Sequence, residues 1–122
     1  MPRAWAAVTE RGPTVLAIVV DDDLRALVKH MLDGLYTVLL AGNAAEALGV
    51  ARSSQVDVLV TEAEHGRRIA DRLRQHNPWL AVLYIVGHPD FTGLEGEVML
   101  KQPFSGEELR HAIGALRHED EL

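Results

Sequence analysis

The chain has 122 residues, the usual size of one domain and enough to bury a hydrophobic core. Its composition, 48% hydrophobic and 25% charged, is that of an ordinary globular protein, while its net charge of −6 argues against a nucleic-acid partner. Without cysteine the chain has no disulfides or thiolate metal ligands, and no apolar run is as long as a membrane span. Residues 1–14 lack the apolar core of a secretory signal, so we expect a cytoplasmic protein with no membrane contact.

Strand-like and helix-like segments alternate along the whole chain. Continuous apolar runs indicate strands buried on both faces, and apolar residues three or four positions apart indicate amphipathic helices. In chain order the expected elements are strand 15–20, helix 24–32, strand 36–41, a helix opened by the capping box of Asn43 and Glu46, strand 56–61, a short helix around 69–73, strand 81–86, strand 98–100, and a helix opened by the capping box of Ser105 and Glu108. This alternation predicts an α/β domain with a five-stranded parallel sheet and helices on both faces. We expect the domain to span residues 15–117, between an N-terminal extension (1–14) and a C-terminal tail (118–122).

Three adjacent carboxylates, Asp21, Asp22 and Asp23, follow the first predicted strand. In a doubly wound sheet ligands bind beyond the carboxyl ends of the strands, where Glu62 follows the third strand. Close carboxylates repel one another, and a hard divalent cation such as Mg²⁺ relieves that repulsion. The sequence therefore predicts an acidic pocket of Asp21, Asp22 and Glu62 that binds Mg²⁺ weakly. The alternative is a solvated turn in which Asp23 caps the following helix.

Five segments, in this order and on these elements, resemble the receiver domain of two-component response regulators. They are IVVDDDLRALV, YTVLLAGNAAEAL, VDVLVTE, LAVLYIVGH and KQPFSGEELRHAIGAL. The resemblance implies a flavodoxin-like fold in which an acidic pair binds Mg²⁺ and an Asp at the end of the third strand accepts a phosphoryl group. It also implies a Ser or Thr at the end of the fourth strand and a Lys before the proline that follows the fifth.

Four positions of the implied site carry other residues. Glu62 stands at the phosphoacceptor position, Val86 at the hydroxyl position, and Gln102, directly before Pro103, at the lysine position. Met99 stands where the family usually has a switch aromatic. A carboxylate displaced by roughly 1 Å can cost on the order of 100-fold in rate, valine donates no hydrogen bond, and glutamine carries no charge to strengthen one. We therefore expect that Glu62 is not phosphorylated and that the domain does not switch.

Two connections are also shorter than in the family. Several residues are missing between Glu62 and Gly66, and the stretch from Gly87 to Gly96 contains Pro89 and shows no helical periodicity. We expect the fourth helix of the receiver fold to be shortened or missing.

These observations favour an atypical receiver domain in two-component (phosphorelay) signal transduction, not an enzyme, that acts without phosphorylation as a protein-interaction module. Its partner would be a histidine kinase or another signalling protein, and a homodimer is a further expectation. One alternative is a working Mg²⁺-dependent phosphoacceptor that uses Glu62, against which the missing hydroxyl and lysine weigh. The other is a small metal-dependent phosphatase, for which no nucleophile–base pair is found. A solvated face is expected for the arginines of the third helix: Arg67, Arg68, Arg72 and Arg74.

Overall fold

Five parallel strands form one sheet in the computed structural model, which describes residues 13–87 and 97–121. The strands are β1 (Thr14–Ile18), β2 (Thr37–Ala41), β3 (Val58–Glu62), β4 (Ala81–Val86) and β5 (Val98–Lys101). Their order in the sheet is β2-β1-β3-β4-β5, the flavodoxin-like order. The predicted α/β fold is therefore confirmed.

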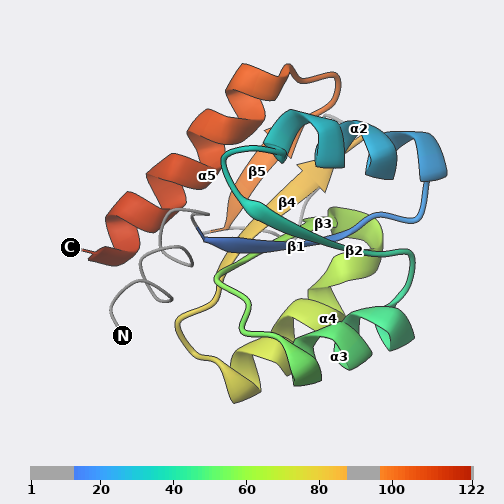
Figure 1. Cartoon of the computed structure of the whole chain (residues 1–122), viewed down its shortest axis with the longest axis vertical. Helices are drawn as coiled ribbons and strands as arrows, with labels where there is room; N and C mark the ends of the chain where they lie inside the picture. The colour runs from blue at the N-terminus through green and yellow to red at the C-terminus, as the bar shows by residue number, and fades with distance from the viewer. Residues whose placement is uncertain (1–12, 88–96, 122) are drawn as a thin grey trace.

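Helices cover both faces of this sheet (Figure 1). They are α2 (Asp22–Leu32), α3 (Ala44–Ser53), α4 (Ala63–His76) and α5 (Gly106–Glu121). One face carries α2 and α5, and the other carries α3 and α4 (Figure 1). Among these helices none has both the length and the hydropathy that a membrane span requires. The last helix continues through most of the segment that we expected to be a tail.

Alternate residues of the central strands face opposite helical layers, as the pleat of a strand requires. Leu16 of β1 and Leu59 of β3 are buried in the cluster that α3 and α4 cover, together with Ile69 of α4. Val15 and Val60 are buried in the second cluster, against α2 and α5. Because both faces are covered, the central strands are continuous apolar runs in the sequence.

One helix differs from the prediction. We predicted a short helix after a shortened loop, but α4 begins at Ala63, directly after β3, and has 14 residues. The reason is Gly66, whose missing side chain lets the first turn of the helix rest on Thr61. A Cβ atom at Gly66 would lie 2.3 Å from both Oγ1 and Cγ2 of Thr61. The prediction about the fourth receiver helix concerns residues 88–96, which lie outside the described residues.

The expectation of a solvated arginine face is wrong for Arg74. Its guanidinium is partly buried and donates two hydrogen bonds of 3.3 Å to the two carboxylate oxygens of Glu97, just before β5. The bond to Glu97 raises the pKa of Arg74. Burial raises the pKa of Tyr84, and the negative charge of Glu97 adds to that effect. The ion pair thus joins the end of α4 to the start of β5.

Candidate functional site

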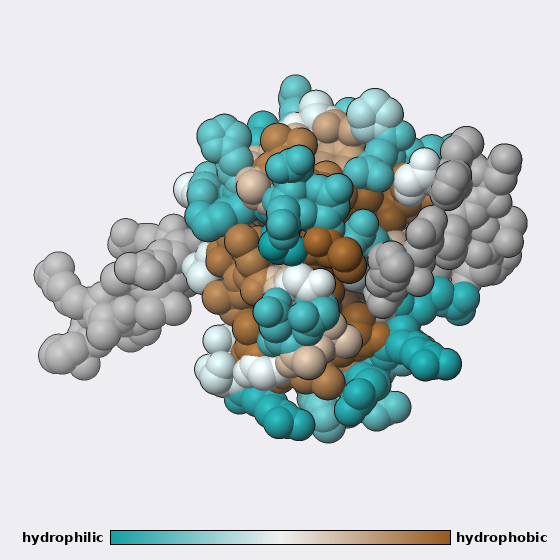
Figure 2. Space-filling model, turned by 90° about the vertical axis from the view of Figure 1, so that its right-hand side faces the viewer, coloured by the Kyte–Doolittle hydropathy of each residue, from teal (hydrophilic) through white to brown (hydrophobic). Residues whose placement is uncertain are grey.

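The candidate site lies at the carboxyl edge of the sheet. In Figure 1 the strands run toward the right-hand side, so Figure 2 looks onto this edge. Hydrophobic surface crosses the middle of the face, with hydrophilic residues above and below it (Figure 2). Val20, which follows β1 here, is 53% exposed.

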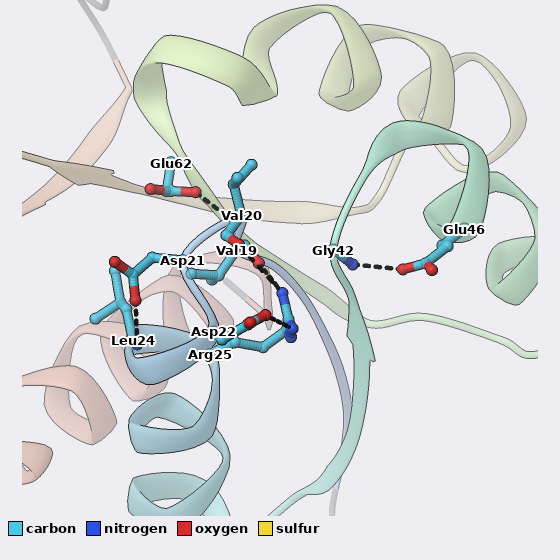
Figure 3. A network of polar contacts seen from close by, with 9 residues as sticks. All are labelled: Val19, Val20, Asp21, Asp22, Leu24, Arg25, Gly42, Glu46 and Glu62. Carbon is cyan, nitrogen blue, oxygen red and sulfur yellow. Dashed lines mark hydrogen bonds and ion pairs between the residues drawn. The ribbon is translucent and has the colours of Figure 1, made fainter.

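Glu62 reaches from the end of β3 toward the end of β1 (Figure 3). Its Oε1 accepts a hydrogen bond of 2.7 Å from the backbone N–H of Val20. The β1–β3 ladder ends at the pair Ile18 and Thr61, so the Glu62 carboxylate supplies an acceptor beyond the last paired residues. Glu62 also occupies the N-cap position of α4 without capping it, and there the positive end of the helix dipole favours its negative charge. Glu62, at the position where the resemblance predicts a phosphoacceptor, is thus held by a hydrogen bond to the backbone of Val20.

The two aspartates after β1 also have partners within the chain (Figure 3). Asp21 caps α2, since its Oδ1 accepts a hydrogen bond of 3.0 Å from the N–H of Leu24. Our alternative assigned that role to Asp23, which was wrong. Asp22 forms an ion pair with Arg25 one turn along the helix. The first two carboxylates therefore stabilise the start of α2.

Arg25 is the residue at this edge that the sequence reasoning missed. Its Nη1 donates a hydrogen bond of 2.7 Å to the carbonyl of Val19, while Nη2 bonds to Asp22. The guanidinium also lies against the end of β2, because a Cβ atom on Gly42 would be 3.1 Å from Nη1. Its spacing of three residues from Asp22 on a predicted helix could have predicted the ion pair. The contacts of Arg25 with the ends of β1 and β2 could not be predicted from the sequence, since they depend on the fold.

The short connection between β2 and α3 is stabilised by side chains of its own residues and of the first turn of α3. Asn43 is the N-cap of α3 as predicted, with its Oδ1 accepting from the N–H of Glu46 at 2.9 Å, but the Glu46 carboxylate reaches the residue before Asn43, so the predicted capping box forms only in part. Glu46 Oε1 accepts in turn from the N–H of Gly42 at 2.6 Å (Figure 3). The carboxylate of Glu46 is therefore committed to the backbone of this connection.

The residues present do not form a ready metal site. Among the side chains that the structure describes, which exclude those of residues 64–65 and 117–121, no three histidine, aspartate or glutamate side chains gather into a group that could hold a metal ion. The predicted ligands Asp21, Asp22 and Glu62 each use a carboxylate oxygen for a contact within the chain. A cation would have to displace at least one of these contacts, and Arg25 already supplies a positive charge.

The other predicted positions lie at the ends of β4 and β5. Val86 is buried in the cluster under α3 and α4, so its side chain belongs to the core. The N–H of Gln102 donates a hydrogen bond of 2.9 Å to the carbonyl of Val86, which extends the β4–β5 pairing by one residue. The Gln102 side chain lies close to Gly87, since a Cβ atom built on Gly87 would be 3.3 Å from Gln102 Oε1. The peptide bond between Gln102 and Pro103 is cis. Met99 pairs with Tyr84 in the sheet and is 44% exposed.

No family model matches the sequence, and no curated protein matches it. Solved structures do match. The signal receiver domain of an HD domain-containing protein from Pseudomonas fluorescens Pf-5 is 23% identical, with a TM-score of 0.77 over 89% of this chain and 97% of that one. A response regulator receiver protein from Sinorhizobium medicae WSM419 is 23% identical, with a TM-score of 0.78 over 88% and 96% of the two chains.

The chemotaxis response regulator CheY4 of Vibrio cholerae is also 23% identical, with a TM-score of 0.73 over 85% of this chain and 98% of that one. At this level of identity the likeness concerns the fold. The chain has the fold of response-regulator receiver domains, as its sequence segments predicted.

Proposed function

We propose that this protein is a signalling module of two-component systems that works in the cytoplasm without phosphorylation of Glu62. Its role is to bind a protein partner, such as a histidine kinase or another signalling protein, or a second copy of itself. The receiver fold supports the signalling role. The hydrogen bond between Glu62 and Val20 carries the second part of the proposal, since it commits the phosphoacceptor position to holding the structure together.

The surroundings of Glu62 also disfavour phosphoryl transfer. A nucleophilic carboxylate needs donors that stabilise the charge of the transferring group. Val86 is buried and has no donor to offer. Gln102 offers a neutral amide at most, and its oxygen lies beside Gly87. Because charge-assisted hydrogen bonds are about twice as strong as neutral ones, replacement of a lysine here removes much of that stabilisation.

Weak binding of Mg²⁺ is part of the same proposal. The carboxylates of Asp21 and Asp22 are exposed, so a divalent cation can approach them. To bind tightly it would have to displace Arg25 from Asp22, or Glu62 from the N–H of Val20. No step of the proposed function passes through the metal, and the proposed module is not an enzyme.

Phosphoryl labelling tests the proposal directly. The protein is incubated with Mg²⁺ and acetyl phosphate, and its intact mass is measured. We expect no phosphoryl adduct on the wild-type chain. The matched control is the triple variant Glu62→Asp, Val86→Thr and Gln102→Lys, which restores three groups on the same scaffold and is expected to label at least partly. An adduct on the wild-type chain that disappears in Glu62→Gln would refute the proposal and favour a working phosphoacceptor.

An NMR titration tests the absence of a switch. A ligand shifts a conformational equilibrium only when its affinity differs between the two states. With Val86 buried and the neutral Gln102 at the predicted lysine position, beryllofluoride with Mg²⁺ has little to bind differently. We expect small amide shifts confined to the carboxyl edge. Large shifts at Val86, at Met99 and along α5 would mean that a working switch is present.

A further inference from the structure

A second feature lies at the opposite, amino edge of the sheet, where α3 and α4 end (Figure 1). A pocket of about 530 Å³ opens there, within the range of roughly 300–1,000 Å³ typical of binding pockets. The last turns of α3 and α4 and the residues before β3 and β4 line it. The buried Leu73 and Leu80 contribute apolar lining, and Trp79 stands at the same site with 82% of its surface exposed.

Asn77, one of the lining residues, joins two backbone segments of this pocket. Its Nδ2 donates a hydrogen bond of 3.0 Å to the carbonyl of Val56, and its Oδ1 accepts one of 3.2 Å from the N–H of Trp79. Asn77 also follows the last residue of α4, where its own N–H bonds to the carbonyl of Leu73. The backbone that carries the exposed indole is therefore held in place, so Trp79 is presented on a defined loop.

The pocket is positively charged although the chain carries a net charge of −6. Arg52, Arg72 and His76 line it, and no carboxylate does. The ion pairs found within the described residues involve Arg25, Lys29 and Arg74, but neither Arg52 nor Arg72. Cations near a helix C-terminus partly offset its dipole, which is equivalent to about half a negative charge. The C-terminal ends of α3 and α4 together are equivalent to about one negative charge. They therefore offset about one of the two positive charges of Arg52 and Arg72, and about one positive charge remains.

We infer that this pocket binds an acidic segment of a partner protein that carries an apolar anchor. Binding hot spots are enriched in tryptophan and arginine, and both residue types line this pocket. The anchor enters between Leu73 and Leu80 and packs on Trp79, while flanking carboxylates meet Arg52 and Arg72. This inference rests on the proposed role in protein interaction and names the surface and the chemistry of the partner.

The chain's own first residues are a rival occupant, because β1 begins at the same edge of the sheet. Residues 1–12 contain an apolar stretch with Trp5. They also contain Arg3 and Arg11 against a single acid, Glu10, so their charge repels the pocket. Charge complementarity therefore favours an acidic partner over this segment.

The test uses the full chain with Trp5→Phe, so that Trp79 is the remaining tryptophan. Its fluorescence is titrated with the acetylated and amidated hexapeptide Glu-Glu-Leu-Phe-Glu-Glu. We expect a saturable change in Trp79 emission that weakens as salt is added. In the double variant Arg52→Glu and Arg72→Glu the affinity should fall about tenfold or more. Arg67→Glu is the control, because Arg67 lies on α4 like Arg72 but is exposed and outside the pocket. This change should alter the affinity less than about twofold.

Besides a failed titration, three results would overturn the inference. One is equal binding of a peptide in which lysines replace the glutamates, and another is equal binding of one in which alanines replace the leucine and phenylalanine. The third is binding that appears only in Trp5→Ala, because the first residues would then occupy the pocket. The assay does not involve Glu62, so a phosphoryl adduct there would refute the proposed function and leave the pocket standing. A titration without binding would refute the pocket and leave the proposed function standing. Thermal melting of the double variant checks that it is folded.

Discussion

The carboxyl and amino edges of the sheet carry charges in different ways. At the carboxyl edge Glu62, Asp22 and Arg25 all have partners within the chain. At the amino edge Arg52 and Arg72 line an open pocket and form no ion pair with another described residue. The charges around Glu62 at the carboxyl edge are thus paired within the chain, whereas Arg52 and Arg72 at the pocket have no ion-pair partner among the described residues.

The signs of these charges follow from the fold itself. In a parallel α/β sheet every helix begins at the carboxyl edge and ends at the amino edge. Carboxylates near the starts of helices and arginines near their ends both complement the helix dipole. Charge sign alone therefore indicates no function at either edge. What distinguishes the Glu62 region from the pocket is whether its charges are paired, since other charges at the amino edge, such as Arg74 with Glu97, do form ion pairs. Changes to that pairing, or to the packing beneath it, test the difference.

The largest effect is expected at Gly66, where α4 rests on the carboxyl end of β3. A Cβ atom there would lie 2.3 Å from Thr61 Oγ1 and Cγ2, so Gly66→Ala should destabilise the fold by about 3 kcal/mol, the upper part of the usual cost of overpacking. The matched control is Gly49→Ala in α3, where nothing lies within 4 Å of the new Cβ atom. That change should stabilise the protein by about 0.5–1 kcal/mol through helix propensity. Urea denaturation measures both, and similar values for the two variants would contradict the close packing.

The second effect concerns the bond that holds the phosphoacceptor position. Glu62→Ala leaves the N–H of Val20 without its acceptor and should cost about 1.5 kcal/mol. Glu62→Gln keeps an acceptor oxygen but loses the charge, so it should cost roughly half as much. Glu107→Ala, at an exposed position on α5, is the control and should stay within about 0.5 kcal/mol. If Glu62→Ala were as stable as this control, the bond would not hold the edge together.

The third prediction compares the arginines of the two edges directly. Arg25→Ala removes an ion pair and the donor to the Val19 carbonyl, and should cost about 1 kcal/mol. Arg52→Ala removes a side chain with no ion-pair partner among the described residues and should change stability by less than about 0.5 kcal/mol. Denaturation of the two variants at the same ionic strength checks the difference. Equal losses would mean that the contacts of Arg25 contribute no more to stability than the side chain of Arg52 does.

Much of the fold could be predicted from the sequence, because the spacing of apolar residues and the helix-capping residues are patterns of neighbouring positions in the chain. The capping box at Ser105 and the N-cap at Asn43 occur as predicted, and the strand order followed from the family resemblance. The contact between Glu62 and Val20 joins residues 42 positions apart, so no local pattern could show it. The same holds for Gly66 on Thr61, where a helix begins without a loop because a side chain is absent.

The pocket at the amino edge was missed for a related reason. Its lining comes from four segments, and each alone resembles an ordinary helix end or connection. The sequence predicts one solvated face for the arginines of α4, yet Arg74 pairs with Glu97 while Arg72 lines the pocket. Only the fold separates them, because it decides which side of the helix meets a neighbour.

The smallest effect at neutral pH is expected for Tyr84→Phe, and it should emerge only in alkali. Burial raises the pKa of Tyr84, with the charge of Glu97 adding to it. Above pH 10, near the pKa of an unfolded tyrosine, the unfolded chain loses this proton while the folded chain keeps it. The stability from this group is therefore complete below that pH and falls as pH rises toward the folded pKa. Urea denaturation at pH 9 and pH 11 should show a smaller alkaline loss in Tyr84→Phe than in the wild type. Glu97→Gln should also reduce the loss, because it removes the second cause of the shift. An unchanged loss in Tyr84→Phe would mean that other groups govern stability in alkali.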